Sequence, residues 1–336
     1  MNILVDIGHP GHVHFYKNAI REWKDQGHSI FITAREISVV LGLLRNEKLE
    51  PTKVIPTYGG KFGKHRELIK HNHELIKVIR DNNIDRCTSI GGTYMVFAAA
   101  ITKRPSIVFT DTDTALSANR ITFPFATKIV TPKIFPIDLG KKHLRYSGLH
   151  ELAYLGDDFH PDPGVLSRYN LKNAEAFSIV RLSSWQAAHD VAITPASLNI
   201  VKEFINMLGN HGRVIIIPEG PVHNSLTPYT MDIKPEDFHH LLAFARMCVT
   251  EGATTASEAC VLGTPCLYTN PAKPCYIPLL EKHQLLLSSN RHENIITKTR
   301  ELMSIADHPE NTASNRRKLL DELCETHSTI VNTVLK

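Results

Sequence analysis

The sequence predicts an α/β protein made of two doubly wound parallel sheets. Three observations lead to this fold. The chain has 336 residues, enough for about two domains. Apolar strand-like runs alternate with amphipathic helical segments, and this alternation restarts after a polar stretch near the middle of the chain. Consecutive βαβ units place helices on both faces of a parallel sheet, so each half is expected to bury its own core.

The first half begins with a buried strand, ILVDI (3–7), a glycine-rich turn, GHPGH (8–12), and a helix over 13–26. A basic amphipathic helix is expected at KHRELIKHNHELIKVIR (64–80), with its apolar side chains on one face. Those side chains are Leu68, Ile69, Leu75, Ile76 and Ile79. Further strands are predicted at 28–33, 85–90, 106–110 and 128–131.

The second half repeats the pattern from residue 177. Strands are predicted at 177–182, 213–218, 246–251 and 264–269, and helices around 195–208, 235–245 and 254–262, with a final helix over roughly 311–334. The expected organisation is therefore an N-terminal domain (1–160), a linker (161–176), a C-terminal domain (177–320) and a terminal helix (321–336) that packs back on the N-terminal domain. Ligands of such sheets bind at the carboxyl ends of the strands, so a cleft between the domains is the expected site.

The composition excludes several classes of protein. Hydrophobic residues make up 42% and charged residues 21%, which excludes a largely disordered chain. A net charge of +4 is too small to predict nucleic-acid binding, although residues 1–160 carry an excess of six positive charges and residues 161–336 an excess of two negative ones. No membrane-spanning run or signal pattern is present, so a cytoplasmic protein is expected. The six cysteines form no CxxC pair and are expected to be reduced and buried.

The most informative segment is VTEGATTASEACVLGTPCLY (249–268), where a strand, a small-residue turn and a helix follow one another. The free N–H groups of a helix N-terminus bind anions, most often phosphate. Small residues let a phosphate approach, and a carboxylate one turn further along could accept two hydrogen bonds from a ribose diol. An ordinary capped helix with a surface glutamate is the alternative.

This segment resembles the donor-nucleotide motif of GT-B glycosyltransferases, nearest the UDP-N-acetylglucosamine transferase of peptidoglycan synthesis. UDP-N-acetylglucosamine 2-epimerases share a looser version. The resemblance implies a pyrophosphate-binding turn and a ribose-binding glutamate, Glu258. The turn residues that match are Gly252, Ala253, Thr254 and Thr255. Glu251 stands where that family often has serine.

Three N-terminal segments extend the resemblance in the same order along the chain. IGHPGHVHF (7–15) is similar to the family's first glycine-rich loop, with Gly8, Gly11 and a matching histidine, His12. SIGGTYMVFAAA (89–100), with Gly91 and Gly92, resembles an acceptor-side loop, and the stretch 107–132 resembles the segment that follows it. The sequence also looks like members of domain-of-unknown-function family 354, which are predicted glycosyltransferases.

Two residues of the first half are candidate catalytic groups. His12 could act as a general base or donate to a phosphate, because histidine titrates near neutral pH, or it could only cap the helix. Asp111, favoured over Asp113, follows a strand and could deprotonate an acceptor hydroxyl, or it could cap the next helix. A metal site at His9, His12 and His14 is not expected, because side chains on a turn entering a helix diverge.

Two further segments could contact substrate. Arg181 and Ser183 follow the first strand of the second half, where a guanidinium could neutralise the leaving diphosphate. A salt bridge to the linker is the alternative for Arg181. The basic helix 64–80 could touch an anionic membrane that carries a lipid-linked acceptor, or it could simply present a solvated face.

The sequence therefore predicts an inverting, metal-independent GT-B glycosyltransferase without a cofactor. It would move a sugar, expected to be an N-acetylhexosamine, from a UDP-sugar to a glycan or lipid-linked acceptor in polysaccharide biosynthesis. A UDP-sugar 2-epimerase of the same fold and a non-catalytic nucleotide-sugar-binding protein are the alternatives.

Overall fold

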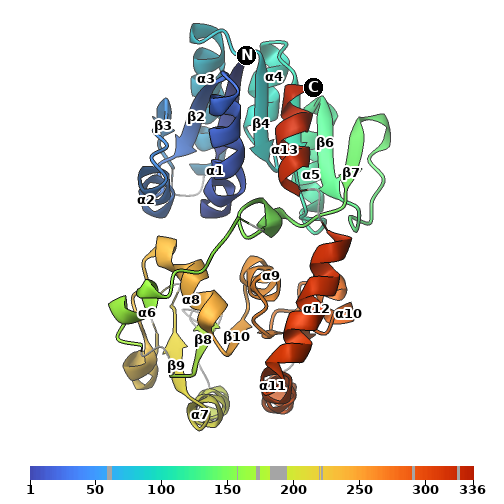
Figure 1. The fold of residues 1–336 in the computed structure, drawn as a ribbon. Coiled ribbons are helices and arrows are strands. Elements are labelled where there is room, and N and C mark those ends of the chain that lie inside the picture. Colours follow the sequence, from blue (N-terminus) through green and yellow to red (C-terminus); the bar gives the residue numbers. More distant parts are fainter. Residues whose placement is uncertain are drawn as a thin grey trace. The chain divides into compact units, whose positions relative to one another are not determined.

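A computed structural model describes residues 1–58, 63–156, 158–171, 175–181, 195–218, 220, 222–289, 292–323 and 326–336. The chain divides into two compact units, one of Met1–Tyr154 with Leu323–Lys336 and the other of Leu155–Glu322. Each unit is a parallel sheet between two layers of helices (Figure 1).

Within its described residues, the first unit has a seven-stranded parallel sheet in the order β3-β2-β1-β4-β5-β6-β7. Its strands are β1 (Asn2–Ile7), β2 (Ser29–Arg35), β3 (Lys53–Ile55), β4 (Arg86–Ile90), β5 (Ser106–Phe109), β6 (Lys128–Pro132) and β7 (His143–Tyr146). Its α-helices are α1 (Pro10–Asp25), α2 (Ser38–Asn46), α3 (Gly63–Asp81), α4 (Met95–Ile101), α5 (Leu116–Thr122) and α13 (Thr326–Leu335). Three short 3-10 helices complete the unit: η1 (Phe123–Phe125), η2 (Gly140–Lys142) and η3 (His150–Ala153).

Helix α13 brings the end of the chain back to the first unit, where it packs on α1 (Figure 1). The indole Nε1 of buried Trp23 donates to the carbonyl of Val331 at 3.3 Å. The hydroxyl of Thr326 donates to the carbonyl of Leu149 at 2.9 Å. The last helix therefore fixes the segment just before η3.

In the described part of the second unit, five parallel strands follow the order β12-β11-β10-β8-β9. These strands are β8 (Phe177–Arg181), β9 (Arg213–Ile216), β10 (Met247–Thr250), β11 (Cys266–Tyr268) and β12 (Leu286–Ser288). The α-helices are α6 (Gly164–Arg168), α7 (Pro195–Gly209), α8 (Phe238–Phe244), α9 (Ala253–Leu262), α10 (Ile277–Lys282), α11 (His292–Ala306) and α12 (Pro309–Glu322), with 3-10 helices η4 (Asn224–Tyr229) and η5 (Pro235–Asp237).

The interior strands lie where the sequence predicts them, and the differences fall at edges and ends. Strands β3, β7 and β12 are not predicted from the sequence, and each is a sheet edge of three or four residues. The stretch 161–176, predicted as a linker, contributes α6, whose apolar side chains are buried and which contacts α8. The predicted final helix is two helices, α12 and α13, which belong to different units.

Helix α3 buries Leu75 and Ile79 of the predicted apolar face but leaves Ile69 exposed. Ile69 is 71% exposed, whereas Glu67, His71 and Leu75 are buried. These three positions recur every four residues and share one side of a helix, while Ile69 points about 200° away from Glu67. Two polar side chains are buried there because the first unit supplies partners for them.

Candidate functional site

The N-terminus of α9 directly follows β10. Gly252 is the N-cap, and its N–H donates to the hydroxyl of Thr250 at 3.0 Å. Within the described residues no side chain caps this helix. The N–H groups of Ala253, Thr254 and Thr255 have no helical carbonyl to bond, because the first turn of any helix leaves its donors unpaired. The predicted small-residue turn is thus an open set of donors.

A guanidinium lies beside these donors. Arg181 ends β8, which pairs with β10, and its Nη1 donates to Thr255 Oγ1 at 2.9 Å. Its Cζ lies 5.2 Å from the ring centroid of Phe238, which holds the guanidinium by a cation–π contact. A positive side chain at the positive end of a helix favours an anion between them. The structure therefore brings Arg181 and the predicted turn together.

Glu258 lies on the second turn of α9 and is buried. Its Oε1 lies 2.9 Å from Nε2 of His239, a buried residue of α8, so the imidazole N–H can donate to the carboxylate. One oxygen is thereby held, and the carboxylate keeps the capacity to accept further bonds. Sequence reasoning missed His239. The adjacent histidines of FHH (238–240), in a predicted helix, were its only signal.

Of the two remaining candidates in the second unit, Glu251 and Ser183, the structure describes only the first. Glu251 is buried, and its carbonyl accepts from the amide of Asn270 at 3.2 Å. Ser183 lies outside the described residues.

The first glycine-rich loop is shorter than predicted, because α1 begins at Pro10. Proline suits the first turn of a helix, where its missing N–H costs nothing. His9 is the N-cap, and its Nδ1 accepts from the N–H of Gly11 at 3.2 Å. The N–H of Gly8 donates to Nδ1 of His12 at 3.2 Å. The capping role that is the alternative for His12 therefore belongs to His9.

The contact with Gly8 fixes the tautomer of His12. Because Nδ1 accepts a hydrogen bond, the ring proton must lie on Nε2. Burial, and secondarily the neighbouring His9, lowers the pKa of His12 to about 3. A neutral imidazole that is protonated on Nε2 is a hydrogen-bond donor, so this geometry favours the donor role over the base.

Asp111 follows β5, and its Oδ2 lies 3.4 Å from Nδ1 of His150 in η3. Burial lowers the pKa of His150, while Asp111 opposes the shift. The imidazole is 8% exposed, and its Nε2 has no hydrogen-bond partner in the part of the chain that the structure describes. A carboxylate on Nδ1 orients a neutral imidazole so that Nε2 can accept a proton. Sequence reasoning missed His150, which no motif marked.

A buried polar cluster lies at the carboxyl ends of β1 and β2. Oδ1 of Asp6 accepts from the hydroxyl of Thr33 at 2.8 Å and lies 3.2 Å from Nε2 of His71. The ring of His71 stacks on that of Tyr94, with centroids 4.2 Å apart. These contacts account for the polar residues that α3 buries.

A second pair, between half-buried Arg35 and buried Glu67, joins β2 to α3. Nε of Arg35 donates to Oε1 of Glu67 at 2.7 Å, and its Nη1 reaches the carbonyl of Gly8 at 3.4 Å. Arg35 therefore links α3 to the loop that precedes α1, the helix that carries His12.

Gly91 and Gly92 form the turn after β4, with φ values of +70° and +67°. A Cβ on Gly92 would lie 2.8 Å from side-chain atoms of Val96 and Val108. Only glycine fits this turn, which gives both residues a structural reason to be there.

Two observations bear on metals and membranes. Within the described residues, no group of three or more His, Cys, Asp and Glu side chains is arranged to hold a metal ion. Among the described helices, none has the length and apolar character of a membrane span.

Comparison with known proteins agrees with the predicted architecture. A family model described as "Protein of unknown function (DUF354)" matches residues 1–334. No curated protein matches the sequence.

Several solved structures share the fold. The UDP-GlcNAc 2-epimerase of Neisseria meningitidis, bound to UDP-GlcNAc, has a TM-score of 0.70 at 14% identity, with 100% of both chains covered. The UDP-N-acetylglucosamine 2-epimerase of Rickettsia bellii has a TM-score of 0.73 at 14% identity, covering 100% of this chain and 96% of that one. The glycotransferase of kitacinnamycin has a TM-score of 0.64 at 14% identity, covering 100% and 99%. The GT-B fold, with two Rossmann-like parallel-sheet domains, is confirmed.

Proposed function

This chain belongs to the DUF354 family, and we propose that it is an inverting GT-B glycosyltransferase that uses a UDP-sugar. The proposal depends chiefly on one observation, the uncapped N-terminus of α9 with the guanidinium of Arg181 beside it. A diphosphate is the anion that such a turn accommodates, because several N–H donors and one guanidinium can bind its oxygens together. Solved structures of the same fold include one bound to UDP-GlcNAc, which supports the choice of nucleotide.

The donor would bind through groups of the second unit alone. The diphosphate would accept from the N–H groups of Ala253, Thr254 and Thr255, and Glu258 would accept from the ribose hydroxyls. His239 would orient that carboxylate through its 2.9 Å contact. The departing UDP gains negative charge as the bond to the sugar breaks, so donors that already point at it lower the barrier.

The acceptor would be activated in the first unit. Nε2 of His150 would take the proton from an acceptor hydroxyl, whose oxygen forms the new bond to the anomeric carbon. The bond from that carbon to the diphosphate oxygen breaks, and its electron pair leaves with UDP. Asp111 would hold the imidazole and stabilise its charged form, while Nε2 of His12 would donate to a substrate oxygen. The sugar is proposed to be an N-acetylhexosamine and the acceptor a glycan or a lipid-linked saccharide.

Titration calorimetry with UDP tests the donor site. We expect Glu258→Ala to lose affinity and Glu203→Ala, an exposed residue of α7, to keep it. Equal UDP affinity in the two variants would refute the donor site. The reaction is proposed to need no metal or cofactor, so added EDTA should leave sugar transfer unchanged.

A UDP-sugar 2-epimerase is the second candidate, because two of the compared structures are UDP-N-acetylglucosamine 2-epimerases. An epimerase needs no acceptor, so incubation with UDP-N-acetylglucosamine alone separates the two reactions. Conversion of the sugar without an acceptor would favour the epimerase. Tight UDP binding without turnover of any donor would identify a non-catalytic binding protein instead.

A further inference from the structure

The connection between β6 and β7 differs from its neighbours in the first unit. Helix α4 joins β4 to β5, and α5 with η1 joins β5 to β6. Parallel neighbours usually need such a helical crossover. Residues 133–142, all of which the structure describes, join β6 to β7 with only the 3-10 helix η2. The sheet face beside β6 is therefore incompletely covered.

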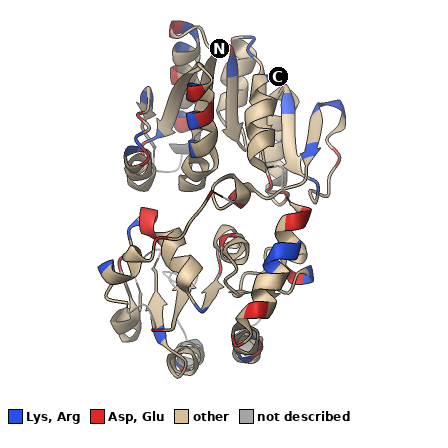
Figure 2. Cartoon of the chain, in the orientation of Figure 1, with Lys and Arg blue, Asp and Glu red and all other residues tan. Residues whose placement is uncertain are grey.

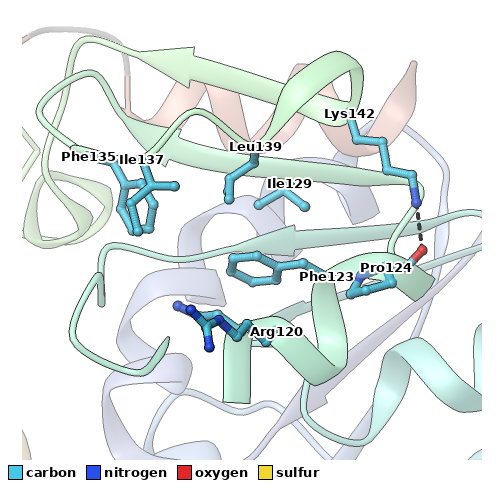
Figure 3. A pocket seen from close by; sticks show the side chains of 9 residues that line it. Arg120, Phe123, Pro124, Ile129, Phe135, Ile137, Leu139 and Lys142 are labelled. Carbon is cyan, nitrogen blue, oxygen red and sulfur yellow. Dashed lines mark hydrogen bonds between the residues drawn. The ribbon is translucent and has the colours of Figure 1, made fainter. Parts of the chain in front are cut away.

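A pocket of about 460 Å³ lies at this incompletely covered face (Figure 3). That volume falls within the range of small-molecule sites, roughly 300–1,000 Å³. Most of its lining is apolar and comes from η1, β6 and the 133–142 loop. The apolar lining residues are Phe123, Pro124, Ile129, Phe135, Ile137 and Leu139. Apolar surface that a ligand removes from water contributes about 25 cal/mol per Å², so an apolar group gains by entering.

The segments that line the pocket also carry exposed apolar side chains. Ile137 of the pocket is 38% exposed, and neighbouring Ile121 and Phe125 are 61% and 50% exposed. Burial of such side chains would ordinarily be favourable, so their exposure together indicates a surface that meets an apolar partner.

Two cations accompany the apolar lining. Nζ of Lys142 donates to the carbonyl of Pro124 at 2.6 Å, which holds its charge against the pocket wall (Figure 3). Arg120 also lines the pocket, and it is exposed, with no hydrogen-bond or ion-pair partner among the described residues. Residues 115–146 carry six Lys and Arg against one acidic residue, Asp138. Figure 2 shows this predominance of basic residues along the loop and β7.

We propose that this pocket binds the hydrocarbon chain of an anionic amphiphile, that is, an acyl or isoprenoid chain with a phosphate or carboxylate head. The chain contacts Phe123, Ile129 and Leu139, and the head binds the guanidinium of Arg120, which pairs with either anion in bidentate geometry. The pocket shares no residue with the proposed donor and acceptor groups. This inference therefore holds whether or not the proposed reaction is correct.

Titration calorimetry with dodecyl phosphate below its critical micelle concentration tests the proposal. The wild-type protein should bind it. Arg120→Gln should weaken binding about tenfold, as expected for the loss of one charge-assisted contact. Ile137→Trp, which fills the pocket from a half-exposed position, should abolish binding. Lys141→Gln is the matched control, because this cation is exposed and adjacent to Lys142 but does not line the pocket.

Further ligands identify the chemistry of the head and chain. Dodecanoate in place of dodecyl phosphate shows which head the site prefers, and failure of both to bind would overturn the proposal. Inorganic phosphate or dodecyltrimethylammonium binding as tightly as dodecyl phosphate would overturn it too, since the first lacks the chain and the second has the wrong charge.

Two controls separate a filled pocket from misfolding and from dimer formation. Thermal unfolding shows whether Ile137→Trp folds. If that variant does not fold, Leu139→Lys is used instead, because it places a charge in the apolar wall of the pocket. Dodecyl phosphate binding that neither pocket variant changes would overturn the proposal. A wild-type dimer that becomes monomeric in Ile137→Trp would identify a second copy of the chain as the occupant and would overturn it as well.

Discussion

Two strand–helix junctions that carry candidate site residues, β1–α1 and β10–α9, differ in whether protein groups accept from the first N–H groups of the helix. At the start of α1, the imidazole of His9 accepts from the N–H of Gly11, and the carbonyl of His9 accepts from the N–H of His12. At the start of α9, the N-cap is Gly252, and no side chain among the described residues accepts from the N–H groups of Ala253, Thr254 and Thr255. A capped helix end is satisfied within the protein, whereas an uncapped one keeps its donors for a ligand.

This difference assigns different chemistry to the two junctions. The α9 junction adds a guanidinium and is suited to an anion. The α1 junction uses its donors internally and presents neutral imidazoles, with the Asp111–His150 contact in the same unit. Nucleotide binding and proton transfer should therefore respond to separate substitutions.

The largest expected effect is on proton transfer. Asp111→Asn and His150→Gln should each lower kcat for sugar transfer about 10²- to 10⁴-fold, the usual contribution of a positioned base. UDP affinity should stay unchanged, because neither residue belongs to the donor site. Steady-state kinetics and calorimetry measure the two quantities. Asp113→Asn is the control, and a greater loss of kcat in that variant than in Asp111→Asn would move the role to Asp113.

A smaller effect is expected for Glu258, whose carboxylate is proposed to bind the ribose. Glu258→Ala should weaken UDP binding about 10- to 100-fold, because hydrogen bonds to a charged group contribute about 1.5–3 kcal/mol. Glu258→Gln should lose less, since its amide oxygen can still accept from His239. Calorimetry with UDP and with UMP measures both variants. A loss of equal size in Glu203→Ala would show that the effect is not specific to this site.

Converting the open junction into a capped one tests the comparison directly. Gly252→Asp should raise the free energy of unfolding by a few tenths of a kcal/mol, because aspartate caps slightly better than glycine. A Cβ at this position would meet neighbours no closer than 3.5 Å, so the side chain fits. UDP affinity should fall about tenfold as the carboxylate takes the donors and repels phosphate. Chemical unfolding and calorimetry measure the two changes, and unchanged UDP binding would contradict the open-donor interpretation.

The capped junction should make stability depend on pH. The pKa of His12 is lowered to about 3, so between pH 3 and the unfolded value near 6.5 the unfolded chain binds more protons. Stability from this group is therefore present at pH 7 and is lost as the pH falls. About 1 kcal/mol should disappear between pH 7 and 5.5. His12→Asn, which keeps an acceptor for Gly8, should show a smaller loss in urea unfolding, and an identical pH profile would contradict this origin.

Much of the fold is predictable because buried parallel strands are continuous apolar runs. ILVDI and RVIIIP are clear in the sequence for this reason. The edge strands β3, β7 and β12 are not, since each is only partly buried and lacks a continuous apolar run. The sequence pattern places the start of α1 three residues late, because glycines beside a proline are typical of a turn.

The sequence by itself determined the two sheets, the point between them where the strand–helix alternation begins again, and the small-residue turn before α9. These features depend on local pattern and spacing. Only the tertiary structure paired Glu258 with His239 and Asp111 with His150, which lie 19 and 39 residues apart along the chain. It also decided that α3 buries Glu67 and His71 and leaves Ile69 exposed. The physical reason is that a polar side chain can be buried only where the fold supplies its partner, and those partners come from elements distant in sequence.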